Sequence, residues 1–149
     1  LASIMHDVGK IAIPDRILAK PGKLTPEEFE VMKTHTVQGG ELLERIPQFQ
    51  HNGAYHYAWD IARHHHERWD GNGYPDRLKG DEITPWAQVV SIADVYDALN
   101  CKRVYKAAFP REKVLEMIRT GQCGVFNPKL LDCFFAVEPK LALLYENLE

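Results

Sequence analysis

Apolar residues recur at helical spacing along most of the chain. At the start, Leu1, Ile4, Met5 and Val8 follow the period of an α-helix, so the spacing predicts a helix over residues 1–8. Thr25-Pro26-Glu27-Glu28 has the form of a capping box and predicts a helix that carries the stripe Phe29, Met32 and His35. Gly39-Gly40 is expected to interrupt this helix, and its continuation ends before Pro47.

Five more helices are expected further along the chain. They run over about residues 54–67, from Pro85, from Pro110 to Gly121, and from Pro128, and a last helix holds Leu141, Leu144, Tyr145 and Leu148. In the helix from Pro85 we expect Val89, Ile92, Ala93, Tyr96 and Leu99 to face inward. Ile11-Ala12-Ile13 is the only short alternating run, and Pro14 closes it. The pattern therefore predicts an all-α bundle of six or seven helices.

Length and charge narrow the functional class. The 149 residues fit one domain, and a net charge of −3 argues against general binding to DNA, although a local basic cluster can still hold a small anion. No apolar run is long enough for a membrane span. Three cysteines without CxxC spacing favour a reducing, cytoplasmic setting. Because the chain starts inside a helical pattern without Met, we interpret residues 1–149 as one domain cut from a longer protein.

Histidine and aspartate residues fall at positions where the apolar stripes predict burial. They are His6 and Asp7, His35, the triplet His64-His65-His66, and Asp94. Each alone is better explained as a dipole partner, a paired core residue or a solvated helix end. Together they would be costly to bury unless they share a cation. A donor set of nitrogen and oxygen suits Mn, Fe or another octahedral ion better than a closed zinc site, and its size suggests two ions bridged by Asp7.

Basic and aromatic residues near the histidines and aspartates are candidates for binding a phosphate or a base. Lys10 lies one turn from the His6-Asp7 doublet, and Arg103 and Lys106 follow the helix of Asp94. They could hold phosphate oxygens, or they could form a solvated basic patch. Tyr74, in a glycine-rich loop, could stack on a base or could anchor its loop on the protein body.

Several of these strings resemble one known family. His6-Asp7-Val8-Gly9-Lys10 looks like the HDxGK element of the HD phosphohydrolase superfamily. The stretch from His65 to Pro75, HHERWDGNGYP, looks like the HHExxDGxGYP element of its HD-GYP subfamily. Residues 20–25 and 93–99 match that subfamily as well, so the resemblance covers nearly the whole chain.

The resemblance implies an HD-domain helical bundle that hydrolyses cyclic di-GMP, or a related cyclic dinucleotide, to linear pGpG and in some members GMP. It implies two or three divalent ions, iron or manganese, with Asp7 bridging two of them. The implied ligands are His6, Asp7, His35, His65, His66 and Asp94. His64 is left out because His65 and His66 directly precede Glu67. Asp7 and Lys10 are the expected catalytic residues, and Tyr74, Asp97, Arg103 and Lys106 are expected to bind substrate.

Two departures from the family and two rival functions stay open. The family's helix before the HD doublet is missing, and Arg103-Val104-Tyr105-Lys106 stands where the family shows Arg-Pro-Tyr-Lys. One rival is a module without turnover that senses a cyclic dinucleotide or docks a protein through Gly73-Tyr74-Pro75. The other is an HD phosphohydrolase of a different nucleotide. A regulatory domain is expected upstream of Leu1.

Overall fold

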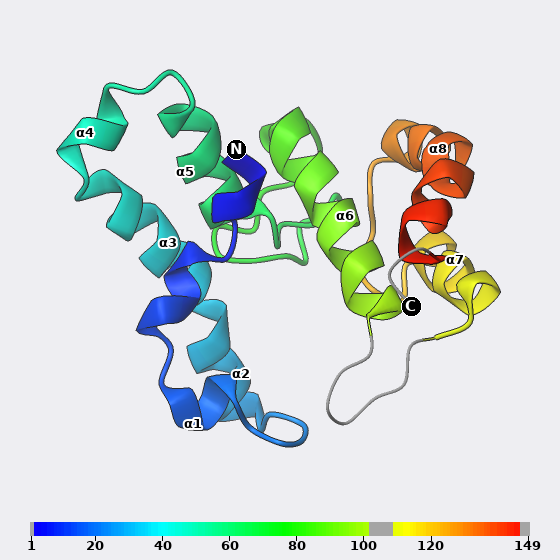
Figure 1. The fold of residues 1–149 in the computed structure, drawn as a ribbon, viewed down its shortest axis with the longest axis horizontal. Helices are drawn as coiled ribbons and strands as arrows, with labels where there is room; N and C mark the ends of the chain where they lie inside the picture. The colour runs from blue at the N-terminus through cyan, green and yellow to red at the C-terminus, as the bar shows by residue number, and fades with distance from the viewer. Residues whose placement is uncertain (1, 102–108, 147–149) are drawn as a thin grey trace.

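The chain folds as helices joined by loops (Figure 1). The computed structural model describes residues 2–101 and 109–146, which form eight α-helices and three short 3₁₀ segments and no β-strand. In chain order these are η1 (Ala2–Met5), η2 (Val8–Ala12), α1 (Asp15–Leu18), α2 (Pro26–Lys33), α3 (His35–Glu44), α4 (Pro47–Gln50), α5 (Tyr55–His64), η3 (Gly80–Glu82), α6 (Pro85–Asn100), α7 (Arg111–Arg119) and α8 (Pro128–Glu146). The all-α prediction is confirmed. None of the described helices is long and apolar enough to cross a bilayer.

The helices form two groups that meet at α6. The first group contains α3, which packs on α5 and on η2, and α5 in turn packs on η1 and α6. In the second group α7 and α8 pack on the other side of α6, at the right of Figure 1. Helix α6 is thus shared, and it carries Asp94 toward the first group.

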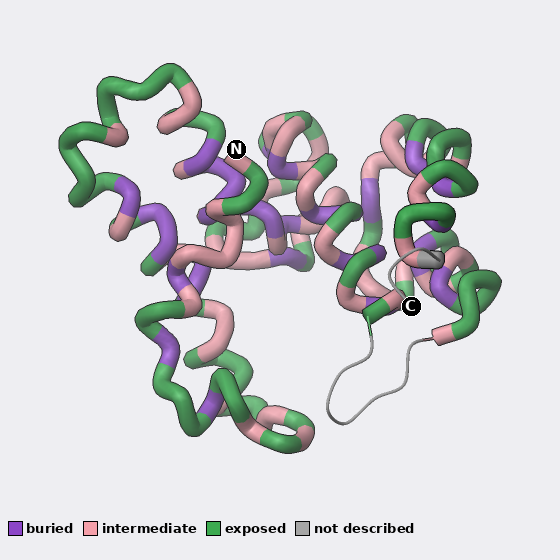
Figure 2. Tube along the Cα trace, in the orientation of Figure 1, coloured by how far each residue is buried: buried purple, intermediate pink, exposed green. Residues whose placement is uncertain are grey.

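Each group has its own hydrophobic core. Leu43, Ala58 and Ala62 form the core between α3 and α5, and the small alanines let these helices approach closely. Figure 2 shows the buried positions along α5 and the residues just after it. The larger core joins α6, α7 and α8 through Ile92, Val95, Tyr96, Leu99, Val114, Ile118, Phe126 and Phe134.

A buried carboxylate ties the second group together. Glu138 of α8 is 2% exposed; it accepts a hydrogen bond from the Tyr96 hydroxyl at 2.9 Å and from Arg111 Nε at 2.9 Å. The Arg111 guanidinium lowers the pKa of Glu138, so this group stays ionised. One side chain therefore connects α6, α7 and α8.

The helix starts marked by capping signals agree with the structure. Thr25 caps α2: its hydroxyl accepts from Glu28 N at 3.2 Å, and Glu28 accepts from Thr25 N at 2.8 Å. Helices α6 and α8 begin at Pro85 and Pro128, and α7 begins directly after Pro110. These starts rest on contacts within one turn, and such local signals are legible in sequence.

The first helix and the glycine break differ from expectation. Residues 1–8 were predicted as a helix, but η1 and η2 are separate 3₁₀ segments with His6 and Asp7 between them. Helix α3 runs through Gly39 and Gly40, and the break falls at Thr34 instead. Gly9 allows η2 to approach α3 closely, because a Cβ on Gly9 would lie 1.9 Å from the carbonyl oxygen of His35 and 2.4 Å from the nitrogen of Gly39. Gly40 lies against the Trp59 ring, with a Cβ there 3.2 Å from Nε1. The glycines of α3 therefore lie at packing contacts and do not end the helix.

Other differences concern the later helices. Helix α8 is continuous through Pro139, where two helices were predicted, and α5 ends at His64 rather than near residue 67. Of the residues expected to face inward on α6, Val89 is 49% exposed and Ala93 is also exposed. The sequence period does not show which side of α6 its neighbours cover, because packing partners come from distant parts of the chain.

Candidate metal centre and cleft

Three histidine rings are held by backbone carbonyls of their own helical turns. His6 Nδ1 lies 2.8 Å from Ser3 O, His35 Nδ1 lies 2.7 Å from Met32 O, and His65 Nδ1 lies 2.9 Å from Ile61 O. In a neutral imidazole, a proton donated from Nδ1 leaves the lone pair on Nε2. Each neutral ring in this tautomer presents its Nε2 lone pair for binding a metal ion.

These Nε2 atoms converge on Asp7. His35 Nε2 and His65 Nε2 lie 3.5 and 3.8 Å from Asp7 Oδ1, and His6 Nε2 lies 3.3 Å from Oδ2. Asp7 Oδ1 is buried and accepts no hydrogen bond, which is true of no other buried side-chain nitrogen or oxygen in the described part of the chain. Leaving such an oxygen without a partner costs free energy, so a cation placed there would satisfy it.

His66 and Asp94 complete the cluster. Ring nitrogens of His35, His65 and His66 all lie within 4.8 Å of one another. Asp94 comes from α6, and its Oδ1 lies 3.8 Å from His6 Nε2. The structure thus brings together all six residues expected to be ligands, from the 3₁₀ segments, α3, the end of α5 and α6. Their role as ligands remains a prediction.

The charge states suit cation binding. Burial lowers the pKa of His35 and His66, and it lowers the pKa of His65 to about 3, so these rings are neutral at pH 7. Burial would raise the pKa of Asp7, but His6 and Lys10 outweigh it and hold that pKa well below the usual range. Neutral imidazoles and an ionised carboxylate are the forms that bind metal ions.

His64 faces away from this cluster. Its Nδ1 lies 2.7 Å from Asp60 Oδ1 and its Nε2 lies 2.9 Å from Asp76 Oδ2. Burial alone would lower the pKa of His64, but the two carboxylates outweigh burial and raise it. Asp60 also accepts from Thr84 and Trp86. Both ring nitrogens are therefore used in a network that links α5 to the loop after it.

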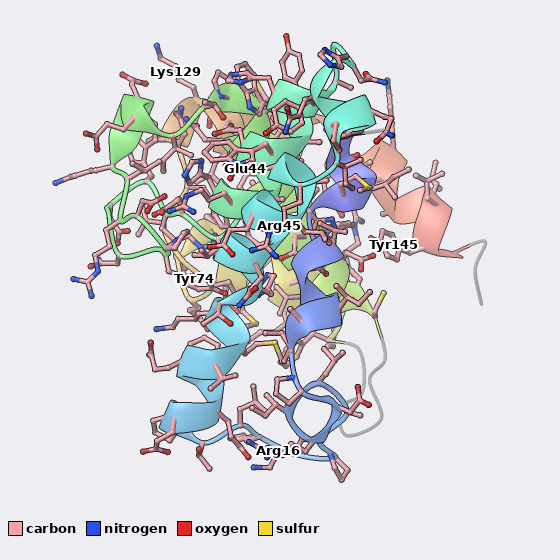
Figure 3. All side chains as sticks on the ribbon, turned by 90° about the vertical axis from the view of Figure 1, so that its left-hand side faces the viewer. Arg16, Glu44, Arg45, Tyr74, Lys129 and Tyr145 are labelled. Carbon is pink, nitrogen blue, oxygen red and sulfur yellow. The ribbon has the colours of Figure 1, made fainter. Side chains whose placement is uncertain are left out.

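That loop is fixed beside the cluster by backbone contacts. Glu67, 2% exposed, accepts from Asp76 N at 2.7 Å and from Leu78 N at 3.1 Å. A Cβ on Gly73 would lie 2.4 Å from Glu67 Cα, so only glycine allows this approach. The next residue, Tyr74, which is labelled in Figure 3, precedes Pro75 in a cis peptide bond and stacks on His66 with ring centroids 4.8 Å apart.

A cleft of about 400 Å³ opens beside the cluster. Its polar wall contains Lys10, His35, His66, Tyr74 and Asp94, and its apolar wall contains Ile17, Leu18, Leu24, Phe29, Met32 and Ala98. Lys10 Nζ lies 2.5 Å from Asp7 Oδ2. A cleft with one apolar wall and a few converging polar groups is typical of a small-molecule site.

The structure also places a lysine that sequence reasoning missed. Lys20 lines the cleft, and its Nζ lies 2.5 Å from Glu28 Oε2. Lys20-Pro21-Gly22-Lys23 reads in sequence as a turn that matches the resembled family, but the pattern does not show that this turn borders the cleft.

The structure bears differently on the four residues expected to bind substrate. Tyr74 lines the cleft. Asp97 is exposed on α6, accepts from the Tyr145 hydroxyl at 2.8 Å and is not among the residues that line the cleft. Arg103 and Lys106 lie outside the described residues, so their roles stay predictions.

The donors present fit a divalent metal ion. They are imidazole nitrogens and carboxylate oxygens, they surround a buried oxygen without a partner, and no cysteine belongs to the cluster in the described part of the chain. This donor set is typical of Fe or Mn rather than of a thiolate zinc site.

Comparisons with known proteins agree with this picture. The family model described as HD domain matches residues 1–130. A Vibrio cholerae protein named as a probable cyclic di-GMP phosphodiesterase is 45% identical over 141 residues, which cover 92% of this chain and 32% of that protein. A Thermotoga maritima cyclic di-GMP phosphodiesterase is 42% identical over 146 residues, covering 98% of this chain and 39% of that protein.

A third relative carries a different substrate in its name. The Vibrio cholerae 3′3′-cGAMP-specific phosphodiesterase 2 is 45% identical over 131 residues, which cover 88% of this chain and 24% of that protein. The chain thus spans between a quarter and two fifths of the length of these relatives. The match of the family model over most of the chain shows that this chain belongs to the HD domain family.

Proposed function

We propose that this chain is the metal-dependent phosphodiesterase unit of a longer protein and hydrolyses cyclic di-GMP to pGpG. The observation that carries the proposal is the convergence of histidine nitrogens on the buried Asp7 Oδ1, directly beside a cleft that also contains Lys10. The names of relatives at 42% and 45% identity supply the substrate.

His6, Asp7, His35, His65, His66 and Asp94 would hold two divalent ions, iron or manganese, with Asp7 shared between them. When bound, such ions activate water for in-line attack at phosphorus and offset the charge that develops there. A third ion is not required by the residues present.

The chain's own residues bind and orient the substrate. Lys10 faces the cleft with its ammonium group beside Asp7, and it can donate to a phosphate oxygen as a charge-assisted donor. Burial raises the pKa of Tyr74, so its phenol stays protonated and can donate a hydrogen bond. Its ring is held by His66 on one face. The apolar wall around Met32 and Leu24 excludes water and offers a surface for a base.

Hydrolysis assays with defined metal content test the proposal. Purified protein that contains this chain is stripped of metal, reloaded with Mn or Fe, and incubated with cyclic di-GMP, and the products are separated by chromatography. We expect pGpG from the loaded protein and none from the stripped protein. The Asp7→Asn variant should lose both metal and activity, whereas His56→Ala, an exposed position on α5, should retain both. A metal-free protein that hydrolyses cyclic di-GMP at the same rate would contradict the proposal.

A second candidate substrate is 3′3′-cGAMP, because a relative that is specific for it is as similar to this chain as the first cyclic di-GMP relative. The two substrates differ in one base, so a competition assay with equal concentrations separates them. Binding of either nucleotide by the metal-loaded protein without any turnover would instead favour a sensor or protein-docking module.

A further inference from the structure

A second cavity, of about 700 Å³, lies against the loop that carries Tyr74. It shares Phe29, His66 and Tyr74 with the cleft, but Lys10, His35 and Asp94 do not line it. The stacked pair of His66 and Tyr74 therefore forms a wall between this cavity and the metal cluster. The volume is that of a site for a ligand of nucleotide size.

The charged side chains that line this cavity are predominantly cationic. Lys33, Arg68 and Arg77 line it, against the single carboxylate of Glu30. Glu30 Oε1 already lies 2.6 Å from Lys33 Nζ, which leaves the two guanidinium groups without a compensating anion in the lining. Asp70 and Asp76 belong to the same loop but are not among the lining residues.

Arg68 is the most informative of these groups. Its Nη1 donates to the carbonyl of Glu67 at 2.9 Å and to Ser91 Oγ at 2.7 Å, and its Nε donates to Cys123 O at 3.3 Å. All of these acceptors are uncharged, and no described carboxylate forms an ion pair with Arg68. Its Nη2 takes no part in these hydrogen bonds. A largely desolvated guanidinium held by neutral acceptors carries a charge that an anion would compensate.

Arg77 and Lys33 both line the same cavity. Arg77 follows the Tyr74 loop, is exposed and has a positive φ of 56°. Lys33 Nζ lies over the rings of Phe29 and Tyr74, at 5.1 and 5.6 Å from their centroids. Positive charge and aromatic surface thus meet in one volume, a combination that suits a phosphate attached to an aromatic base.

From this arrangement we infer that the cavity between α2, the Tyr74 loop and the α7–α8 turn is a second binding site, for a phosphomonoester of nucleotide size. Arg68 and Arg77 hold the phosphate, and the rings of Phe29 and Tyr74 border the base. The site needs no metal. Hydrolysis of a phosphodiester produces a phosphomonoester, so the product of the proposed reaction is a candidate ligand for this site. Only this connection rests on the proposed function.

Titrations followed by NMR of ¹⁵N-labelled chain test the inference, with a chelator present so that the metal cluster holds no anion. The probes are inorganic phosphate, GMP and guanosine. We expect GMP to shift the amides of Gly71, Gly73 and Gly124, phosphate to shift them more weakly, and guanosine to leave them unchanged. The amide of Gly53, which is remote from the cavity lining, serves as the internal control.

Two matched variants decide whether the cavity is responsible. Arg77→Asn removes a lining charge and keeps a residue type that tolerates positive φ, and Arg45→Asn removes an exposed arginine elsewhere. We expect Arg77→Asn to weaken GMP binding by about tenfold, the size of one charge-assisted hydrogen bond, and Arg45→Asn to have no effect. The inference is overturned if GMP shifts none of the loop amides, if both variants weaken binding equally, or if phosphate binds as tightly as GMP.

Discussion

Replacing His64 by alanine should destabilise the fold while leaving the metal cluster loaded. His64 joins Asp60 and Asp76 through both ring nitrogens, at 2.7 and 2.9 Å, and points away from Asp7. His65, the next residue, points its Nε2 toward Asp7 Oδ1 at 3.8 Å. Neighbouring histidines are therefore expected to give opposite results: loss of stability with metal retained for His64→Ala, and loss of metal for His65→Ala.

The expected magnitude follows from the two hydrogen bonds. The Asp60 side chain is 8% exposed, so its bond to His64 counts as a buried hydrogen bond to a charged group, worth about 1.5–3 kcal/mol. The Asp76 side chain is 34% exposed, and its bond is screened to about 1 kcal/mol or less. The sum is about 2–4 kcal/mol, which for a chain of this size lowers Tm by roughly 10 °C.

Thermal unfolding followed by circular dichroism measures the stability, and metal analysis of the purified variants measures the loading. His56→Ala controls for the loss of a histidine on the same helix, because His56 is exposed. Equal metal loss in His64→Ala and His65→Ala would show that the ligand register is wrong. An unchanged Tm in His64→Ala would show that the network with Asp60 contributes nothing.

Three further predictions concern other parts of the molecule. Glu138→Gln should lower the free energy of unfolding at pH 7. Because the Arg111 guanidinium lowers the pKa of Glu138, the stabilisation is present above pH 4.5 and is lost as pH falls through the lowered pKa. The unfolding curves of wild type and variant should therefore converge in acid. Gly9→Ala should lower the free energy of unfolding in chemical denaturation by about 3 kcal/mol or more and reduce metal content, because its Cβ would meet the α3 backbone. Gly22→Ala, with nothing within 4 Å, should change neither quantity. Unchanged stability and metal content in Gly9→Ala would refute the close approach. Arg103→Ala and Lys106→Ala should each slow hydrolysis of cyclic di-GMP by about tenfold to a hundredfold at unchanged metal content, and full activity would identify them as a solvated patch.

What could be predicted from the sequence depended on how local the cause was. The capping box at Thr25 and the proline at the start of α6 act within one turn, so the pattern showed both starts. The prediction of a break at Gly39-Gly40 is wrong, because these glycines lie inside α3 against Gly9 and the Trp59 ring, which come from distant parts of the chain. The segment after Pro128 and the segment around Leu141 are predicted as two helices, yet α8 runs through both without a break.

The candidate site follows the same rule. The cost of burying His35, His65 and Asp94 pointed to a shared cation, and the structure brings these residues together. The pattern could not show that Lys20 folds over the cleft, or that Asp97 turns to Tyr145 on α8. Both depend on contacts between distant segments.

The histidine rings of the cluster take their orientation from the main chain. The acceptors for His6, His35 and His65 are carbonyl oxygens three or four residues earlier, within the same turn. A carbonyl oxygen persists through any substitution at its position, whereas a carboxylate or hydroxyl in that role would be lost by a single mutation. Substitutions at the acceptor positions therefore leave the tautomer of each ring unchanged. Relatives can change the side chains around the cluster, and with them the preferred nucleotide, without disturbing the nitrogen atoms that would face the metal.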